Sequence, residues 1–277
     1  MAIGVLRSFG AGAAVARGAL AWISRDPSAG ALTRTNFRGR TVTLAGGPAL
    51  AAGATVGAAL GARDARTAAA AITAGAVSGA VGFYDDVVGN RPEQKAAKGF
   101  AGHLGALREG RVTSGLVKIA GVGAAGLAAS ALIGSRHRGA RRTADVLLGA
   151  GVIAGTANLV NLLDLRPGRA IKAGVLVGAP LTLGRGGAVA AGTLGAGAAL
   201  LPADLGEEIM LGDSGANALG ALLGVALVAR TGPVGRAIAL AALAGLTAAS
   251  EKVSFTKVIQ DTPWLRRVDE LGRLPQA

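Results

Sequence analysis

Long runs of small apolar residues, separated by short charged segments, limit what this chain can fold into. Nine such runs cover residues 3–23, 41–61, 67–84, 113–134, 143–163, 170–184, 187–202, 214–230 and 233–250. Most approach the roughly 20 residues that an α-helix needs to cross the hydrocarbon core of a bilayer. Backbone polar groups in that core must be satisfied within the protein, which favours helices. We therefore predict an all-α, polytopic transmembrane helix bundle with about nine spans.

The composition predicts that these helices pack closely. Of 277 residues, 51% are hydrophobic but only 3% are aromatic, and 46 are glycine. Glycine costs a helix in water about 1 kcal/mol relative to alanine, whereas in a bilayer small residues let helices approach one another. We expect a single integral membrane domain over residues 1–277, with a cytoplasmic C-terminal tail over residues 251–277. A low-complexity soluble protein is the alternative that composition leaves open.

The charge of the chain favours a membrane over a nucleic acid as its partner. The formal net charge is +13, but it is divided among short clusters between the apolar runs, with no nucleic-acid-binding motif. Anionic lipid headgroups and the positive-inside rule explain such clusters. Nine spans would place residues 24–40, 85–112, 164–169, 203–213 and 251–277 on one side. Most basic residues lie there, although residues 136–142 do not, which predicts a plasma-membrane protein with this side in the cytoplasm. The absence of cysteine excludes disulfides and zinc–thiolate sites.

Three acidic motifs follow or begin apolar runs on that predicted cytoplasmic side. They are Gly82-Phe83-Tyr84-Asp85-Asp86, Asn158-x-x-Asn161-x-x-Asp164 and Gly212-Asp213-Ser214-Gly215. Carboxylates near hydrocarbon are expensive and usually functional. Adjacent carboxylates repel unless a cation lies beside them, and Mg²⁺ prefers oxygen ligands and substrate phosphates. We predict that Asp85, Asp86, Asp164 and Asp213 surround a shared divalent ion.

Polar and basic neighbours of these acids have two interpretations each. Helical spacing places Asn158, Asn161 and Asp164 along one face. In one interpretation they bind a polar ligand, and in the other they join neighbouring helices by hydrogen bonds. Ser214 suits the N-cap of the following helix. Basic residues near the acids are expected to contact phosphate or to anchor the membrane interface. They are Arg38, Lys98, Lys118, Arg166 and Arg169.

Taken in order, these motifs resemble the polyprenyl-phosphate N-acetylhexosamine-1-phosphate transferase superfamily, which includes phospho-N-acetylmuramoyl-pentapeptide transferase. The resemblance runs from about Arg38 to the C-terminal tail. It implies transfer of a phosphosugar from a UDP-sugar to a polyprenyl phosphate, with release of UMP, in cell-wall or surface-glycan synthesis. It also implies Mg²⁺ as cofactor and a cytoplasmic active site. We expect no nucleic-acid partner, and a homodimer stays open.

The same resemblance implies a role for each motif residue. Asp85, Asp86 and Asp213 would be catalytic, with Asp213 and Asp86 as Mg²⁺ ligands. The residues expected to bind nucleotide or substrate are Asn158, Asn161, Asp164, Arg166, Lys118, Lys98 and Arg38.

Two departures from the family pattern keep other functions open. The family usually continues Asp-Gly-Leu-Asp-Gly after its paired asparagines, whereas this chain reads Asp164-Leu165-Arg166. The family's last cytoplasmic loop is often rich in histidine, and residues 250–257 contain none. One alternative is a divergent relative with an altered donor, or one that only binds polyprenyl phosphate. Another is a membrane transporter with an intramembrane acidic ion site.

Overall fold

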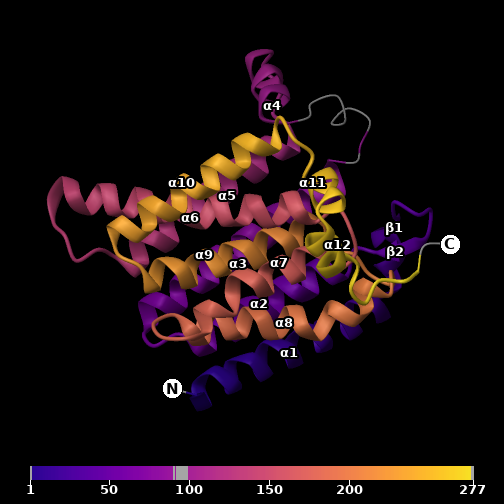
Figure 1. Cartoon of the computed structure of the whole chain (residues 1–277), viewed down its shortest axis with the longest axis horizontal. Helices are drawn as coiled ribbons and strands as arrows, with labels where there is room; N and C mark the ends of the chain where they lie inside the picture. Colours follow the sequence, from indigo (N-terminus) through magenta and orange to yellow (C-terminus); the bar gives the residue numbers. More distant parts are fainter. Residues whose placement is uncertain (1, 90, 92–98, 276–277) are drawn as a thin grey trace.

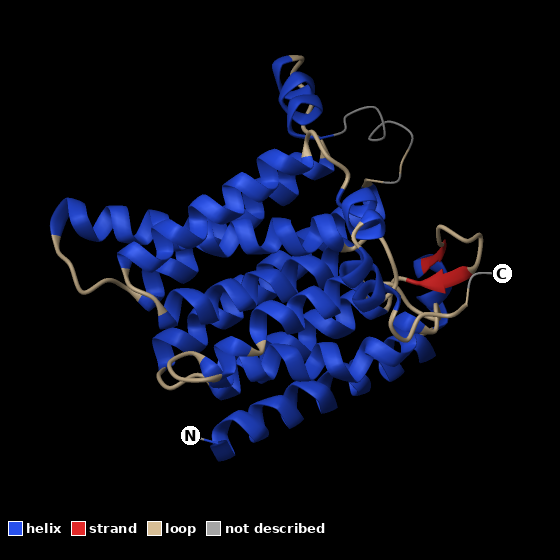
Figure 2. Cartoon of the chain, viewed as in Figure 1, coloured by secondary structure: helices blue, strands red, loops and turns tan. Residues whose placement is uncertain are grey.

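The structure is a computed structural model that describes residues 2–89, 91 and 99–275, and it is mostly helical (Figures 1 and 2). The long helices are α1 (Ala2–Arg25), α2 (Gly46–Gly61), α3 (Ala65–Val88), α5 (Ser114–Ile133), α6 (Gly139–Leu163), α8 (Gly187–Leu205), α9 (Gly212–Arg230) and α10 (Pro233–Ser250). The short helices are η1 (Pro27–Leu32), α4 (Gly99–Arg108), α7 (Arg169–Gly178), η2 (Pro180–Thr182), α11 (Phe255–Asp261) and α12 (Pro263–Glu270). Two short strands, β1 (Thr33–Thr35) and β2 (Thr41–Thr43), form an antiparallel hairpin in addition to the predicted helices.

In the part of the chain that the structure describes, six helices are long and apolar enough to cross a membrane, so the chain is a multi-pass membrane protein. They are α3, α5, α6, α8, α9 and α10. The other three predicted runs also form helices, but each falls short for a different reason. Helix α1 carries Arg7 and Arg17, α2 has only 16 residues, and the run 170–184 is divided at Pro180 into α7 and η2. The prediction of a membrane helix bundle is confirmed at the level of six spans.

Helix α9 forms the centre of the bundle. Its side chains are almost entirely buried from Ser214 to Val228, and α2, α3, α6 and α8 pack around it. Small residues permit this packing, as the composition predicted. A β-carbon on Gly57 of α2 would lie 2.7 Å from the Cα of Gly12 in α1 and 2.9 Å from that of Gly192 in α8. Three helices therefore meet at glycines.

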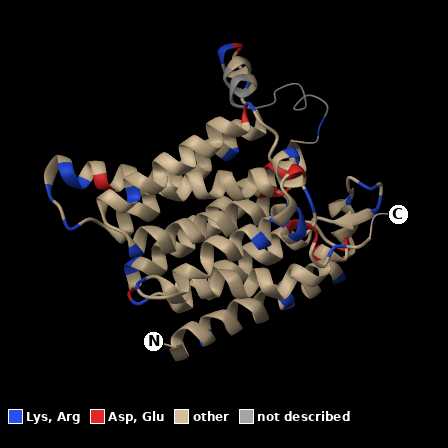
Figure 3. Cartoon of the chain, viewed as in Figure 1, with Lys and Arg blue, Asp and Glu red and all other residues tan. Residues whose placement is uncertain are grey.

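Charged residues gather mostly toward the two ends of the long helices (Figure 3). One end, which we call the acidic end, holds Asp85, Asp86, Asp164, Asp204 and Asp213. The hairpin β1–β2 is attached to this end, because the amide of Met210 donates to the carbonyl oxygen of Thr43 (2.9 Å). The helices α11 and α12 lie at the same end (Figure 1). The opposite end, which we call the arginine end, is formed by residues 62–66, 134–142, 183–186 and 230–236.

Candidate functional site

Three helix ends bring Asp85, Lys118 and Asp213 together at the acidic end. Asp85 lies near the end of α3, Lys118 in the first turns of α5, and Asp213 at the start of α9. The ammonium of Lys118 forms ion pairs with Oδ2 of Asp85 (2.7 Å) and with Oδ2 of Asp213. A cation between two carboxylates offsets their mutual repulsion. Two of the acids from separate sequence motifs thus face a single position that suits a cation.

Asp86 holds the start of α9. Its Oδ1 accepts a hydrogen bond from the amide of Asp213 (2.9 Å), and its Oδ2 accepts one from the amide of Ser214 (3.0 Å). The first amides of a helix lack partners within the helix and attract negative charge. The N-cap prediction for Ser214 was wrong, because its hydroxyl instead donates to the carbonyl oxygen of Gly79 (2.9 Å). The cap comes from α3, a helix distant in sequence.

Two glycines allow this close contact between α3 and α9. A β-carbon on Gly82 would lie 2.3 Å from the carbonyl oxygen of Asp213. Gly212 adopts a φ of 57°, which a residue with a side chain rarely adopts, and a β-carbon there would lie 2.7 Å from Oδ1 of Asp86. The glycines in the two acidic motifs are therefore part of the geometry of the site.

Asp164 lies directly after α6 and lines a cavity of about 150 Å³ together with Arg166, Asp204 and Glu207. Burial, and then the charges of Asp204 and Asp213, raise the pKa of Asp164 well above its ordinary value. Asp164 and Asp204 therefore share one cavity at the acidic end. Oδ2 of Asp204 accepts a hydrogen bond from the amide of Gly168 (2.9 Å), which fixes the loop between α6 and α7.

Two predicted substrate-binding arginines flank Phe37 in the hairpin turn. The guanidinium carbon of Arg166 lies 4.3 Å from the ring centroid, and that of Arg38 lies 5.4 Å from it. Such contacts are attractive because the face of an aromatic ring is electron-rich. Arg38 also pairs with the buried Glu207 (NH1 to Oε1, 2.9 Å). Phe37, Arg38, Arg166 and Arg273 line a further cavity of about 300 Å³.

Arg169 has a structural contact in place of the predicted phosphate contact. Its Nε and NH2 donate to Oδ1 and Oδ2 of Asp269 in α12 (2.8 and 3.0 Å), and its side chain is buried. Arg273 also donates to Asp269 (2.6 Å). These bonds attach the C-terminal segment to the start of α7. In this structure the guanidinium of Arg169 therefore holds the C-terminal segment, and it does so in place of the predicted phosphate contact.

Asn158 and Asn161 do not join the cluster. The amide of Asn158 donates to the hydroxyl of Thr247 (3.1 Å), so it joins α6 to α10, which is the alternative that the sequence left open. Asn161 is half-buried on α6, and its backbone carbonyl oxygen accepts a hydrogen bond from the backbone amide of Asp164 (3.1 Å). Lys98 lies outside the described residues.

Sequence reasoning missed three acids at this end: Asp204, Glu207 and Asp269. All three are at most 6% exposed. None of the three belongs to a motif. The sequence marked them only as acids in a chain that has just 16 acidic residues. Their partners come from segments far away in the sequence, such as Arg38 for Glu207 and Arg169 for Asp269.

The carboxylates at the acidic end fit a Mg²⁺ ion only in part. Among the described residues, no three His, Cys, Asp or Glu side chains are grouped so that they could hold a metal ion. Mg²⁺ is, however, often bound through one or two carboxylates plus substrate phosphates and water. Asp85 and Asp213 supply two such carboxylates that face one position, which Lys118 occupies in this structure. The pair therefore fits an ion that arrives with a phosphate substrate, and the ligand role of Asp86 stays a prediction.

Comparison of the chain with protein-family models gives no match, and comparison with curated proteins gives no significant match. The resemblance to the transferase superfamily therefore stands on the motif residues alone.

Proposed function

We propose that the protein is a Mg²⁺-dependent transferase that moves a phosphosugar from a UDP-sugar to a polyprenyl phosphate. The observation that carries this proposal is the meeting of Asp85, Lys118 and Asp213 from three helix ends. An oxygen of the acceptor phosphate attacks the β-phosphorus of the donor. The bond between that phosphorus and the oxygen bridging to the α-phosphate breaks, and UMP leaves with the bridging oxygen. The product is a polyprenyl diphosphate-linked sugar.

The charges at the acidic end suit this reaction. Donor and acceptor both carry negative phosphates, so their approach requires fixed positive charge. Lys118 supplies an ammonium, and Asp85 and Asp213 hold it where phosphate oxygens would meet. Mg²⁺ bound by the same two carboxylates would displace this ammonium toward the substrate phosphates and would add charge that stabilises the transferring phosphoryl group. Asp86 keeps the start of α9, and with it Asp213, in position.

An apolar groove beside the acids suits the tail of the acceptor. It has a volume of about 500 Å³ and lies between α1, α2 and α3. Its lining includes Trp22, Ala52, Ala80, Phe83 and Ser214. Ser214 also contacts Asp86 through its amide, so the groove ends next to the acids. An isoprenoid chain in the groove would bring its phosphate to Lys118.

The cavity around Phe37 suits the donor. The guanidinium group of Arg166 lies over Phe37 in the lining of this cavity and forms no ion pair among the described residues, so it offers paired donors for phosphate oxygens. UDP-sugars are cytoplasmic metabolites, and most basic segments lie on this side in a nine-span topology. We therefore assign the acidic end to the cytoplasm and the protein to the plasma membrane.

The test is nucleotide release by the purified protein. We expect UMP when the protein is supplied with Mg²⁺, undecaprenyl phosphate and one member of a panel of UDP-sugars. Asp213→Asn should abolish release, whereas Glu251→Gln, an exposed acid in the loop after α10, should not. Lipid binding without release for any donor would favour a relative that only binds the acceptor. Ion flux in proteoliposomes without a lipid product would favour a transporter.

The groove assignment has its own test. Ala80→Trp should fill the groove and raise the KM for polyprenyl phosphate more than the KM for the donor. The matched control is Ala173→Trp, which fills a second apolar groove between α6, α7 and α11. If Ala173→Trp raises the acceptor KM and Ala80→Trp does not, the tail belongs in the second groove.

A further inference from the structure

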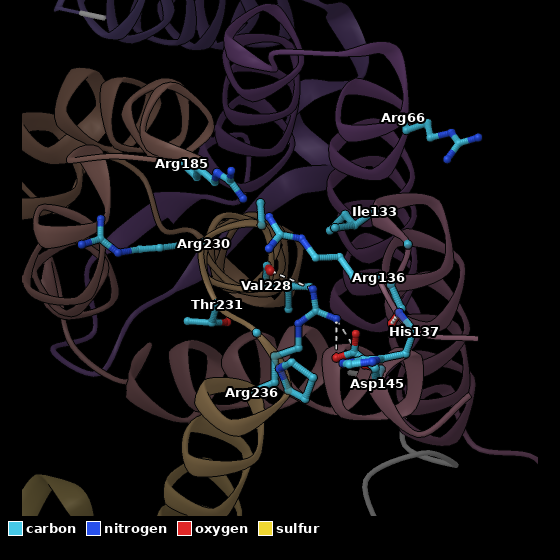
Figure 4. A pocket seen from close by; sticks show the side chains of 15 residues that line it. Arg66, Ile133, Arg136, His137, Asp145, Arg185, Val228, Arg230, Thr231 and Arg236 are labelled. Carbon is cyan, nitrogen blue, oxygen red and sulfur yellow. Dashed lines mark hydrogen bonds and ion pairs between the residues drawn. The ribbon is translucent and has the colours of Figure 1, made fainter. Parts of the chain in front are cut away.

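A cavity of about 590 Å³ lies at the arginine end of the bundle, away from the acids at the other end (Figure 4). It is enclosed by the start of α3, the loop between α5 and α6, the segment before α8, and the turn between α9 and α10. Its basic lining residues are Arg66, Arg136, His137, Arg185, Arg230 and Arg236. Among the described residues, Asp145 is the only carboxylate in the lining. The cavity therefore carries a large excess of positive charge.

Asp145 neutralises only one of these arginines. Its Oδ1 lies 2.8 Å from NH1 of Arg236, and both side chains are buried. In the part of the chain that the structure describes, Arg136 and Arg185 form no ion pair. In Figure 4 their side chains point toward the middle of the cavity, whereas Arg66 and Arg230 point away from it. The guanidinium of Arg230 donates to the carbonyl oxygen of Leu183.

Arg236 is a buried cation with an unused donor. Its side chain is held by Asp145 and by the carbonyl oxygen of Val228, which accepts from NH2 (3.0 Å). Arg236 is only 5% exposed, and its Nε has no hydrogen-bond partner among the described residues. A buried N–H without an acceptor is unfavourable unless a ligand or water satisfies it. This N–H is itself buried, so the donors that an anion in the cavity can reach are the guanidinium groups of Arg136 and Arg185.

We propose that this cavity binds a phosphate-bearing anion. Arg236 is the buried cation in its wall, and the guanidinium groups of Arg136 and Arg185 contact the anion. Guanidinium groups match phosphate oxygens because they present paired, coplanar donors. Since the bundle spans the membrane, this site lies on the face opposite the acidic end. The phosphate belongs either to a lipid headgroup of that leaflet or to a free anion. The inference does not depend on the transfer reaction.

The test compares two double variants with the same loss of charge. Arg136→Ala/Arg185→Ala removes the two guanidinium groups that point into the cavity. Arg141→Ala/Arg142→Ala removes two exposed arginines at the start of α6 that do not line the cavity. Binding of phosphatidylglycerol, of phosphatidylcholine and of inorganic pyrophosphate is measured by native mass spectrometry in non-ionic detergent. Removing two charged hydrogen-bond donors should weaken binding about tenfold or more, while the control variant stays within about twofold of the wild type.

The probes distinguish the sources of the phosphate. Preference for phosphatidylglycerol without binding of pyrophosphate identifies a lipid headgroup, and binding of pyrophosphate identifies a free anion; both support the site. Equal weakening in the two double variants would show a general charge effect and overturn the proposal. Failure of the wild type to bind either anion more tightly than phosphatidylcholine would also overturn it.

Discussion

Replacing Lys118 with methionine removes the cation between Asp85 and Asp213 and keeps most of the side-chain volume. The two carboxylates then face each other without compensation. Breaking a buried ion pair by removing one partner costs about 3–5 kcal/mol. The side chains here are 14–26% exposed, so water reaches them in part. We therefore expect Lys118→Met to lower the free energy of unfolding by about 2–3 kcal/mol.

A divalent cation should reverse this loss. A ligand present at 100 times its dissociation constant stabilises the folded state by about 2.7 kcal/mol, which is close to the expected loss. In the wild type Mg²⁺ must displace the ammonium of Lys118, so its effect should be smaller. A chain of this size shifts its Tm by about 2 °C per kcal/mol. Lys118→Met should thus melt about 4–6 °C lower in EDTA and recover most of this with Mg²⁺.

The assay is thermal unfolding in detergent, followed by tryptophan fluorescence with EDTA or Mg²⁺. Lys252→Met, which removes an exposed lysine, controls for net charge. The reasoning is refuted if Lys118→Met and Lys252→Met melt together in EDTA. It is also refuted if Mg²⁺ stabilises both variants equally, because the acid pair would then not be the cation site.

Two further predictions concern the contacts around the site. Gly82→Ala should lower the free energy of unfolding by about 1–3 kcal/mol, because its β-carbon would lie 2.3 Å from the carbonyl oxygen of Asp213. The control is Gly123→Ala on α5, whose β-carbon would have nothing within 4 Å; this variant should melt no lower than the wild type. Burial raises the pKa of Asp269, but hydrogen bonds and charge from Arg169 and Arg273 outweigh burial and lower it. The docking of α12 should therefore be stable above about pH 4 and be lost as the pH falls through the lowered pKa. Fluorescence of Trp264 in a Trp22→Phe background measures this, and an Asp269→Asn variant that still shows the acid transition would contradict it.

The helices and the gathering of acids could be predicted from the sequence because both depend on local patterns. Apolar runs indicate helices. A carboxylate such as Asp85 at the end of a run indicates where that helix leaves the apolar part of the bundle. The run 170–184 shows the limit of this reasoning. Its composition resembles the other runs, but Pro180 ends α7 after 10 residues, so hydropathy alone overestimates its length.

Partners across the fold could not be predicted in the same way. Ser214 is a suitable cap for α9 by its position in the sequence, but Asp86 approaches the same amides from α3 and takes that role. Arg169 follows a motif and has the chemistry of a phosphate ligand, yet the distant Asp269 pairs with it. The choice between a ligand and an internal partner depends on which segments pack together, and a single sequence does not specify that directly.

The most direct test of the central claim follows the β-phosphate of the donor. UDP-sugars labelled with ³²P at that phosphate are incubated with the protein, Mg²⁺ and undecaprenyl phosphate, and the organic and aqueous phases are then counted. Transfer of a phosphosugar predicts label in the lipid phase and unlabelled UMP in water, and Asp213→Asn should abolish both. Label that stays in the aqueous nucleotide for every donor, although the wild-type protein binds the lipid, would contradict the proposed reaction.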